Sequence, residues 1–143
     1  MKCLVAVTIT AVVGIPLALV GWNMYQASRP PHAVSCAKAL AYIGWKLPEH
    51  TRDHQCVESV DAFSSNMSGT FRMPRTDARP WLASLPGNRF RTAGAEADGV
   101  LVTEDGLHLG VVKPRHPKVD EARVTVRFEG KDTALVSFET FDY

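Results

Sequence analysis

The chain has 143 residues, of which 45% are hydrophobic and 22% are charged, and its 16 basic and 15 acidic side chains give a net charge of +1. Lys2 is the only charged residue before Arg29, so the remainder carries 15 basic and 15 acidic side chains. A general nucleic-acid-binding protein is distinctly basic. We therefore exclude nucleic acid as a partner.

An uncharged segment of twenty residues, Cys3 to Trp22, reads CLVAVTITAVVGIPLALVGW. At ~1.5 Å per residue, a helix of this length spans ~30 Å, which is the thickness of the hydrocarbon core of a bilayer. The segment predicts a transmembrane anchor over residues 1–25 that includes Leu4 and Val20, with Trp22 at the membrane–water interface. The lipid bilayer is thus a predicted partner.

Two other fates of this segment are open. Cleavage by signal peptidase would give a secreted protein, but a cut after Ala27 places the bulky Tyr25 at the −3 position. A lipoprotein site at Cys36 is separated from the apolar segment by Arg29 to His32. We therefore favour a retained single-pass anchor in the cell membrane, with secretion after cleavage as the alternative.

The remaining elements are predicted in chain order from periodicity, caps and turns. Residues 26–35 contain Pro30-Pro31 and predict a stiff linker, and residues 36–143 form the following domain. Ser35 is suited to cap a helix from Cys36 to Ile43 that ends at Gly44. Strands follow at residues 53–60 and 68–73, joined by a polar loop over residues 61–67.

In the second half, Thr76 is predicted to cap a helix over residues 77–85 that packs through Trp81, Leu82 and Leu85, with Pro80 in its first turn. Residues 87–98 and 113–120 are predicted loops. Four further strands are expected at residues 99–103, 107–112, 123–128 and 134–141. The fold class is α+β: one small domain with a mostly antiparallel sheet and two short helices.

Three cysteines are present, and Cys3 lies within the predicted anchor. Cys36 and Cys56 form a lone pair in the following domain, which predicts a disulfide in an exported protein. Closing a loop of about 20 residues stabilises a fold by ~3 kcal/mol in the chain-entropy model. The charges on the two sides of the apolar segment are nearly balanced and do not set its orientation, so the cysteine pair is the main reason to place the domain outside the membrane. The alternative is two buried free thiols in a cytoplasmic domain.

Cations are concentrated in two parts of the domain, whereas the region from Asp120 to Tyr143 is acidic. If they converge, they form a surface for lipid headgroups or an anionic envelope polymer. The alternative is that they pair with the acidic strands or are solvated. The predicted patch consists of Arg72, Arg75, Arg79, Arg89, Arg91, Lys113, Arg115 and Lys118.

No sequence motif predicts a catalytic, cofactor-binding or metal-binding residue. His50 and His54 lie near Cys56, but their spacing crosses a predicted turn, where it does not define a metal site. No nucleophile elbow marks a serine, and no phosphate-binding loop or C-x-x-C motif is present. The sequence therefore favours a protein without a cofactor, and enzyme activity has no positive support.

Two segments carry a resemblance: LPEHTRD followed by TFRMPRTDARPWLASLP, and the final hairpin VTVRF…ALVSFETF. This pattern resembles small membrane-anchored or secreted actinobacterial proteins of unknown function. The resemblance implies location and fold type, and it implies no catalytic residues. The functional hypothesis is an anchored extracytoplasmic binding or scaffolding module, with an accessory subunit of a membrane assembly as one form. The alternative is a small envelope hydrolase.

Overall fold

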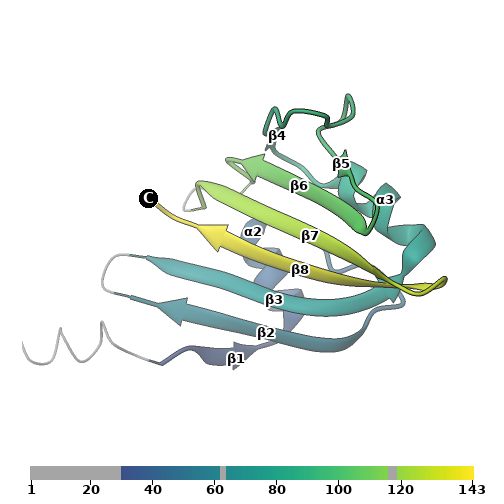
Figure 1. The fold of residues 1–143 in the computed structure, drawn as a ribbon. Coiled ribbons are helices and arrows are strands. Elements are labelled where there is room, and N and C mark those ends of the chain that lie inside the picture. Colours follow the sequence, from purple (N-terminus) through teal and green to yellow (C-terminus); the bar gives the residue numbers. More distant parts are fainter. Residues whose placement is uncertain (1–29, 62–63, 116–118) are drawn as a thin grey trace, which may run out of the picture.

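One antiparallel sheet of eight strands organises the chain, with strand order β1-β2-β3-β8-β7-β6-β4 and β5 paired to β6 (Figure 1). The computed structural model describes residues 30–61, 64–115 and 119–143. Both described helices lie on the same face of the sheet (Figure 1). The elements are β1 (His32–Val34), α2 (Cys36–Ile43), β2 (Arg52–Val60), β3 (Ser65–Pro74), α3 (Arg75–Ser84), β4 (Asn88–Arg89), β5 (Leu101–Val102), β6 (Gly106–Val112), β7 (Glu121–Glu129) and β8 (Thr133–Phe141).

Helix α2 confirms the predicted bounds and caps. The Ser35 side chain accepts a hydrogen bond from the Lys38 backbone N–H, which satisfies a donor at the start of the helix. Gly44 ends the helix with a φ of 87°, a left-handed conformation that glycine adopts without strain. The Trp45 N–H then bonds back to the Leu40 carbonyl at 2.9 Å, which turns Trp45 toward the core.

The predicted disulfide is present between Cys36 at the start of α2 and Cys56 in β2, with a Cα–Cα distance of 5.2 Å. Both cysteines are buried. Gly69 lies opposite Cys56 on β3, and a Cβ placed at Gly69 would lie 2.2 Å from the Cys56 sulfur. The absence of a side chain at Gly69 therefore makes room for the disulfide against the sheet.

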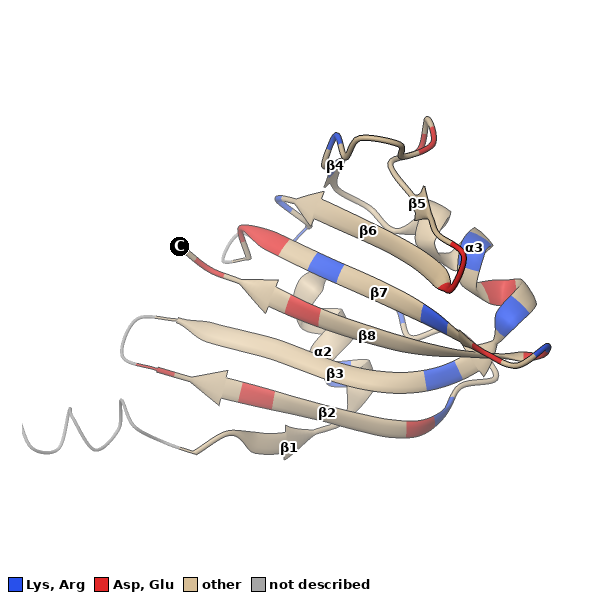
Figure 2. Cartoon of the chain, viewed as in Figure 1, with Lys and Arg blue, Asp and Glu red and all other residues tan. Residues whose placement is uncertain are grey.

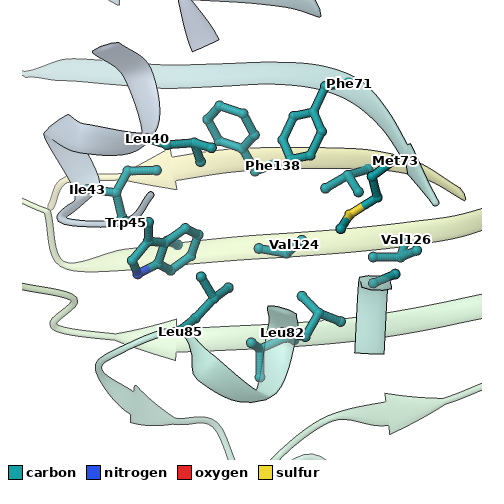
Figure 3. Close-up of a cluster of buried hydrophobic side chains, with 14 of the residues drawn as sticks. Leu40, Ile43, Trp45, Phe71, Met73, Leu82, Leu85, Val124, Val126 and Phe138 are labelled. Atoms are coloured by element: carbon teal, nitrogen blue, oxygen red, sulfur yellow. The ribbon is translucent and has the colours of Figure 1, made fainter. Parts of the chain in front are cut away.

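The core lies between the sheet and the two helices (Figure 3). Alternate residues of the central strands point into it, because side chains of a strand alternate between its two faces. Leu40, Ile43 and Leu82 of the helices are fully buried against these strands. The sheet side of the core includes Phe71, Met73, Val124, Val126, Val136 and Phe138.

Helix α3 begins two residues before the predicted start. The Arg75 N–H bonds to the Asp132 carbonyl of the β7–β8 turn at 2.9 Å, so a tertiary contact replaces the expected side-chain cap. Thr76 lies inside the helix, and Pro80 is its sixth residue rather than part of the first turn. Leu82 and Leu85 are buried as predicted, whereas Trp81 is half-buried.

Strand pairing also extends the predicted elements. Residues 32–34, assigned to the linker from the sequence, form β1 and pair with Cys56, Val57 and Glu58 of β2. Strand β3 begins at Ser65, within the predicted loop, because it pairs with β2 as far as Val60. Residues 88–89 of another predicted loop form β4 against β6. The hydrogen bonds between strands are made by backbone N–H and C=O groups, so a segment with polar side chains can still join the sheet.

The predicted anchor with Leu4, Val20 and Trp22 lies outside the described residues, as do residues 26–29 of the linker and Lys118. Within the described ranges, no helix has both the length and the apolar character that a membrane crossing requires. The anchor thus stays a prediction from the sequence.

Gly69→Ala should destabilise the folded protein by about 1–3 kcal/mol, the usual cost of overpacking a tight site. The added methyl group would meet the Cys56 sulfur at 2.2 Å and the Gln55 carbonyl oxygen at 2.8 Å. The measurement is urea unfolding of the full-length chain in lipid nanodiscs, followed by tryptophan fluorescence.

The control is the same substitution in a Cys36→Ala/Cys56→Ala background, where the sulfur atoms are absent. The cost of Gly69→Ala should be smaller there, because the methyl group meets only backbone and a Cβ atom. An equal cost in both backgrounds would contradict the coupling between Gly69 and the disulfide.

Candidate functional site

Within the described part of the chain, no helix covers the face of the sheet opposite α2 and α3 (Figures 1 and 2). On β7, the exposed residues Arg123, Thr125 and Arg127 alternate with the buried residues Ala122, Val124 and Val126. The alternation is the expected pattern for an antiparallel sheet with one covered face. The open face therefore presents the polar residues of the central strands.

Small polar side chains form a row across four strands of this face. Thr70 of β3 pairs with Ser137 of β8, Ser137 pairs with Thr125 of β7, and Thr125 pairs with His108 of β6. The His108 Nδ1 atom lies 3.3 Å from the Thr125 hydroxyl oxygen. The register thus aligns three hydroxyl groups and an imidazole perpendicular to the strands.

Two hollows follow this row, and they share Arg123 and Thr125. The hollow over β3, β8 and β7 has a volume of about 370 Å³, and the hollow over β7 and β6 has about 320 Å³. We call the two together the trough. It is lined by Ser68, Gly69, Thr70, Phe90, Arg91, Thr92, Leu101, His108, Leu109, Gly110, Glu121, Arg123, Val124, Thr125, Ser137, Phe138 and Glu139.

An ion pair with a buried carboxylate lies in the trough. The Glu121 carboxylate is only 9% exposed, and it accepts a hydrogen bond from the Nε atom of Arg123. The hydrogen bond to Glu121 raises the pKa of Arg123 above its ordinary value. The Arg123 guanidinium also lies over the Phe141 ring, 4.7 Å from its centroid. These contacts hold Arg123 in one orientation and leave half of its side chain accessible.

Two aromatic rings flank the trough. Phe90 is 38% exposed, and its ring packs against Gly110, where any Cβ would lie 2.4 Å from a Phe90 ring carbon. The exposed Tyr143 ring stacks on Phe141 with an interplanar angle of 9°. The trough therefore has apolar surface beside its row of polar groups.

The wall that carries Phe90, Arg91 and Thr92 is attached to α3 by ion pairs. Arg79 of the helix binds Glu96 and, through Nη1, the Asp98 carboxylate at 2.7 Å. The hydrogen bond from Arg79 lowers the pKa of Asp98 below its ordinary value. Arg89 donates to the carbonyls of Leu82, Ala83 and Leu85, so it caps the end of α3.

The predicted cationic residues do not gather in this trough; among the described ones, only Arg91 lines it. Arg72 pairs with Glu129 at 2.7 Å and with Asp53 at 3.4 Å. Arg75 bonds to the Gly130 carbonyl and lies over the Phe128 ring. The other two lie elsewhere: Lys113 is exposed beyond β6, and Arg115 lines a separate hollow beside the helices.

That third hollow is lined by two tryptophans, each of which donates a hydrogen bond to a backbone carbonyl. The Trp45 indole N–H donates to the Pro86 carbonyl, and the Trp81 indole N–H donates to the Lys46 carbonyl, both at 3.3 Å. These bonds join the segment that follows α2 to α3 and to the residues just after it. Because both indole donors are used within the chain, we interpret this hollow as structural.

The sequence matches no protein-family model, and comparisons with curated proteins and with solved structures found no match. Function is therefore argued from the trough alone. The alternation of polar and apolar residues along β7 and β8 was visible in the sequence, and it put Arg123, Thr125 and Ser137 at outward positions. What the sequence lacked was any sign of which strands lie side by side.

Arg79→Gln should raise the pKa of Asp98 toward its ordinary value of about 3.9. Because the folded pKa of Asp98 is lowered, its pairing stabilises the fold above the ordinary carboxyl pKa, and this contribution is lost as the pH falls through the folded value. Acidification should thus destabilise the variant less than the parent. NMR titration of the Asp98 carboxyl carbon measures the shift directly.

The matched control is Arg75→Gln on the same helix, since Arg75 bonds to the Gly130 carbonyl instead. It should leave the titration of Asp98 unchanged. An unaltered Asp98 pKa in Arg79→Gln would show that this ion pair does not hold the wall of the trough.

Proposed function

We propose that this protein is a membrane-anchored binding module of the cell envelope, and that the trough is its binding surface. The observation that carries the proposal is the open face itself, on which one row of polar groups continues through two adjoining hollows. Binding sites in proteins are concave and place a few polar groups beside apolar surface. The trough has both features.

The proposed location outside the membrane is supported by the Cys36–Cys56 disulfide, because disulfides persist in oxidising compartments. Only residues 23–31 separate the end of the apolar segment from β1. Nine extended residues span at most ~30 Å. A retained anchor would therefore hold the trough close to the membrane, where it could meet an envelope polymer or another membrane protein.

We infer binding rather than hydrolysis from the contacts of His108. In a hydrolytic triad, a carboxylate orients one nitrogen of the imidazole. Here the Nδ1 atom of His108 faces the Thr125 hydroxyl instead. The buried Glu121 carboxylate is occupied by Arg123. These groups are arranged to hold one another and to present a fixed polar surface.

Thr125→Trp should abolish binding to isolated cell envelope, because the exposed Thr125 lies where the two hollows meet and an indole would fill that point. The measurement is co-sedimentation of the full-length protein in nanodiscs with envelope from which native membranes were extracted. We expect retention of the parent protein and at least a tenfold loss for the variant.

Ala41→Trp is the control, since Ala41 is exposed on α2, away from the trough. This variant should bind as the parent does. Equal binding of Thr125→Trp and the parent, with both folded by their unfolding midpoints, would contradict the assignment of the trough. Release of cleaved envelope fragments by the parent would favour the hydrolase alternative.

The outward topology predicts that a cysteine at the exposed Lys131, in the β7–β8 turn, reacts with a membrane-impermeant maleimide in intact cells. Lys131→Cys is suited to this test because the native Cys36 and Cys56 are buried and bridged. The measurement is the mass shift of the full-length protein after labelling and reducing-gel electrophoresis.

The same variant in lysed cells reports full reactivity and serves as the reference. Labelling only after lysis would place the domain on the cytoplasmic side of the membrane. Recovery of the labelled protein in the culture medium would indicate cleavage of the apolar segment.

A further inference from the structure

The trough's composition assigns a ligand class. We propose that it binds an uncharged oligosaccharide of the cell envelope; this inference rests on the proposed binding function. The sequence alone suggested an anionic partner, and the position of the charged groups argues for a neutral one.

Charge within the trough is balanced. Its lining contains two arginines, Arg91 and Arg123, and two glutamates, Glu121 and Glu139. Arg123 is paired with Glu121, and Glu139 lies directly opposite Arg123 on β8. A polyanion would meet the buried Glu121 carboxylate and the exposed Glu139 carboxylate, and like charges repel at close range. An uncharged ligand meets no such cost.

The polar groups are suited to a ligand rich in hydroxyls. The Ser68, Thr70 and Ser137 hydroxyls make no hydrogen bond to another described residue, and each of these residues is half-buried. A hydroxyl both donates and accepts, whereas a carboxylate only accepts and a guanidinium only donates. The trough therefore offers all three kinds of partner. A saccharide, whose hydroxyls donate and accept around a ring, can satisfy them together.

The aromatic surface completes this complementarity. Phe90 borders the row at β6, and the stacked rings of Phe141 and Tyr143 lie beside Arg123. A sugar ring has an apolar C–H face as well as its hydroxyls, and that face loses contact with water when it packs on an aromatic ring. The Phe90 ring packs against Gly110, and the Phe90 backbone N–H donates to the Gly110 carbonyl at 3.0 Å, so the ring lies against the sheet beside the row.

The dimensions favour a short chain over a single sugar. The row from Thr70 to His108 crosses β3, β8, β7 and β6. Three interstrand spacings of ~4.8 Å give a length of roughly 14 Å. This geometry predicts that affinity increases with chain length until the row is filled.

The test uses the full-length protein in phosphatidylcholine nanodiscs, without sugar-based detergents. The probes are neutral oligosaccharides of one to six units built from glucose, mannose, galactose, arabinose or N-acetylglucosamine. Immobilised probes identify the binder, and calorimetry measures its Kd. We expect one series to bind with a Kd near or below about 1 mM, typical of a modest interface of about −4 kcal/mol, and to tighten from one unit to about three.

Phe90→Ala should weaken this binding about tenfold, and the paired change Glu121→Gln/Arg123→Gln should do the same without leaving a buried charge unpaired. Arg127→Gln is the control, because Arg127 is on the same strand and face but outside the trough. If Phe90→Ala fails to fold, Ser137→Ala provides a second test of the row. Equal Kd values for the parent and these folded trough variants would overturn the proposal.

Other outcomes separate this inference from the proposed function. Envelope binding that Thr125→Trp abolishes, together with no neutral saccharide binder, would overturn the saccharide and leave the binding module standing. Tighter retention by teichoic-type polyphosphates or by anionic lipid vesicles would overturn it in favour of an anionic ligand. Dimerisation lost in Thr125→Trp would assign the trough to a second copy of the chain. If the parent protein binds neither the envelope nor any neutral saccharide, both proposals are overturned.

Discussion

The pairing of β3 with β8 is the constraint on which the rest of the structure depends. Seven residue pairs, from Ser68–Glu139 to Pro74–Thr133, join two hairpins that are distant in sequence. On one face this pairing puts Phe71 beside Val136 in the core, and on the other face it puts Thr70 beside Ser137 in the trough. A shift of one residue would exchange the two faces, because strand side chains alternate. Core and candidate site therefore depend on a single register.

The register matters for function because the described helices cover only one face of the sheet. Helix α2 is attached through the Cys36–Cys56 disulfide, and α3 begins where the Asp132 carbonyl receives the Arg75 N–H. The disulfide lies on the core side, where the two described helices pack (Figure 3). The opposite face keeps polar groups that are arranged by the backbone ladder rather than by flexible loops. A site supported by strands is held more rigidly than one on loops.

The arginines that cluster in the sequence do not form a cluster of unpaired cations in the fold. The run of arginines from Arg72 to Arg91 looks like a cationic surface along the chain, but Arg72 and Arg79 each meet two carboxylates. Arg89 is used to cap helix carbonyls. Pairing with the acidic C-terminal region was the alternative suggested by the sequence; among these four carboxylates only Glu129 belongs to that region. None of these three arginines lines the trough, and the two arginines and two glutamates that do line it balance in charge, so an uncharged ligand is the proposed occupant.

Much of the local structure could be predicted from the sequence. The Ser35 cap and Gly44 located α2, periodicity located the strands of the β7–β8 hairpin, and the lone cysteine pair predicted the disulfide. These signals are local or depend on composition. The start of α3, the pairing of β1 and the trough depended on contacts between distant residues, such as Arg75 with Asp132 and Thr70 with Ser137. Hydrophobic alternation shows that a strand has two unlike faces. Only the packed sheet decides which strands adjoin and which face the helices leave open, because that choice is made by long-range pairing and burial.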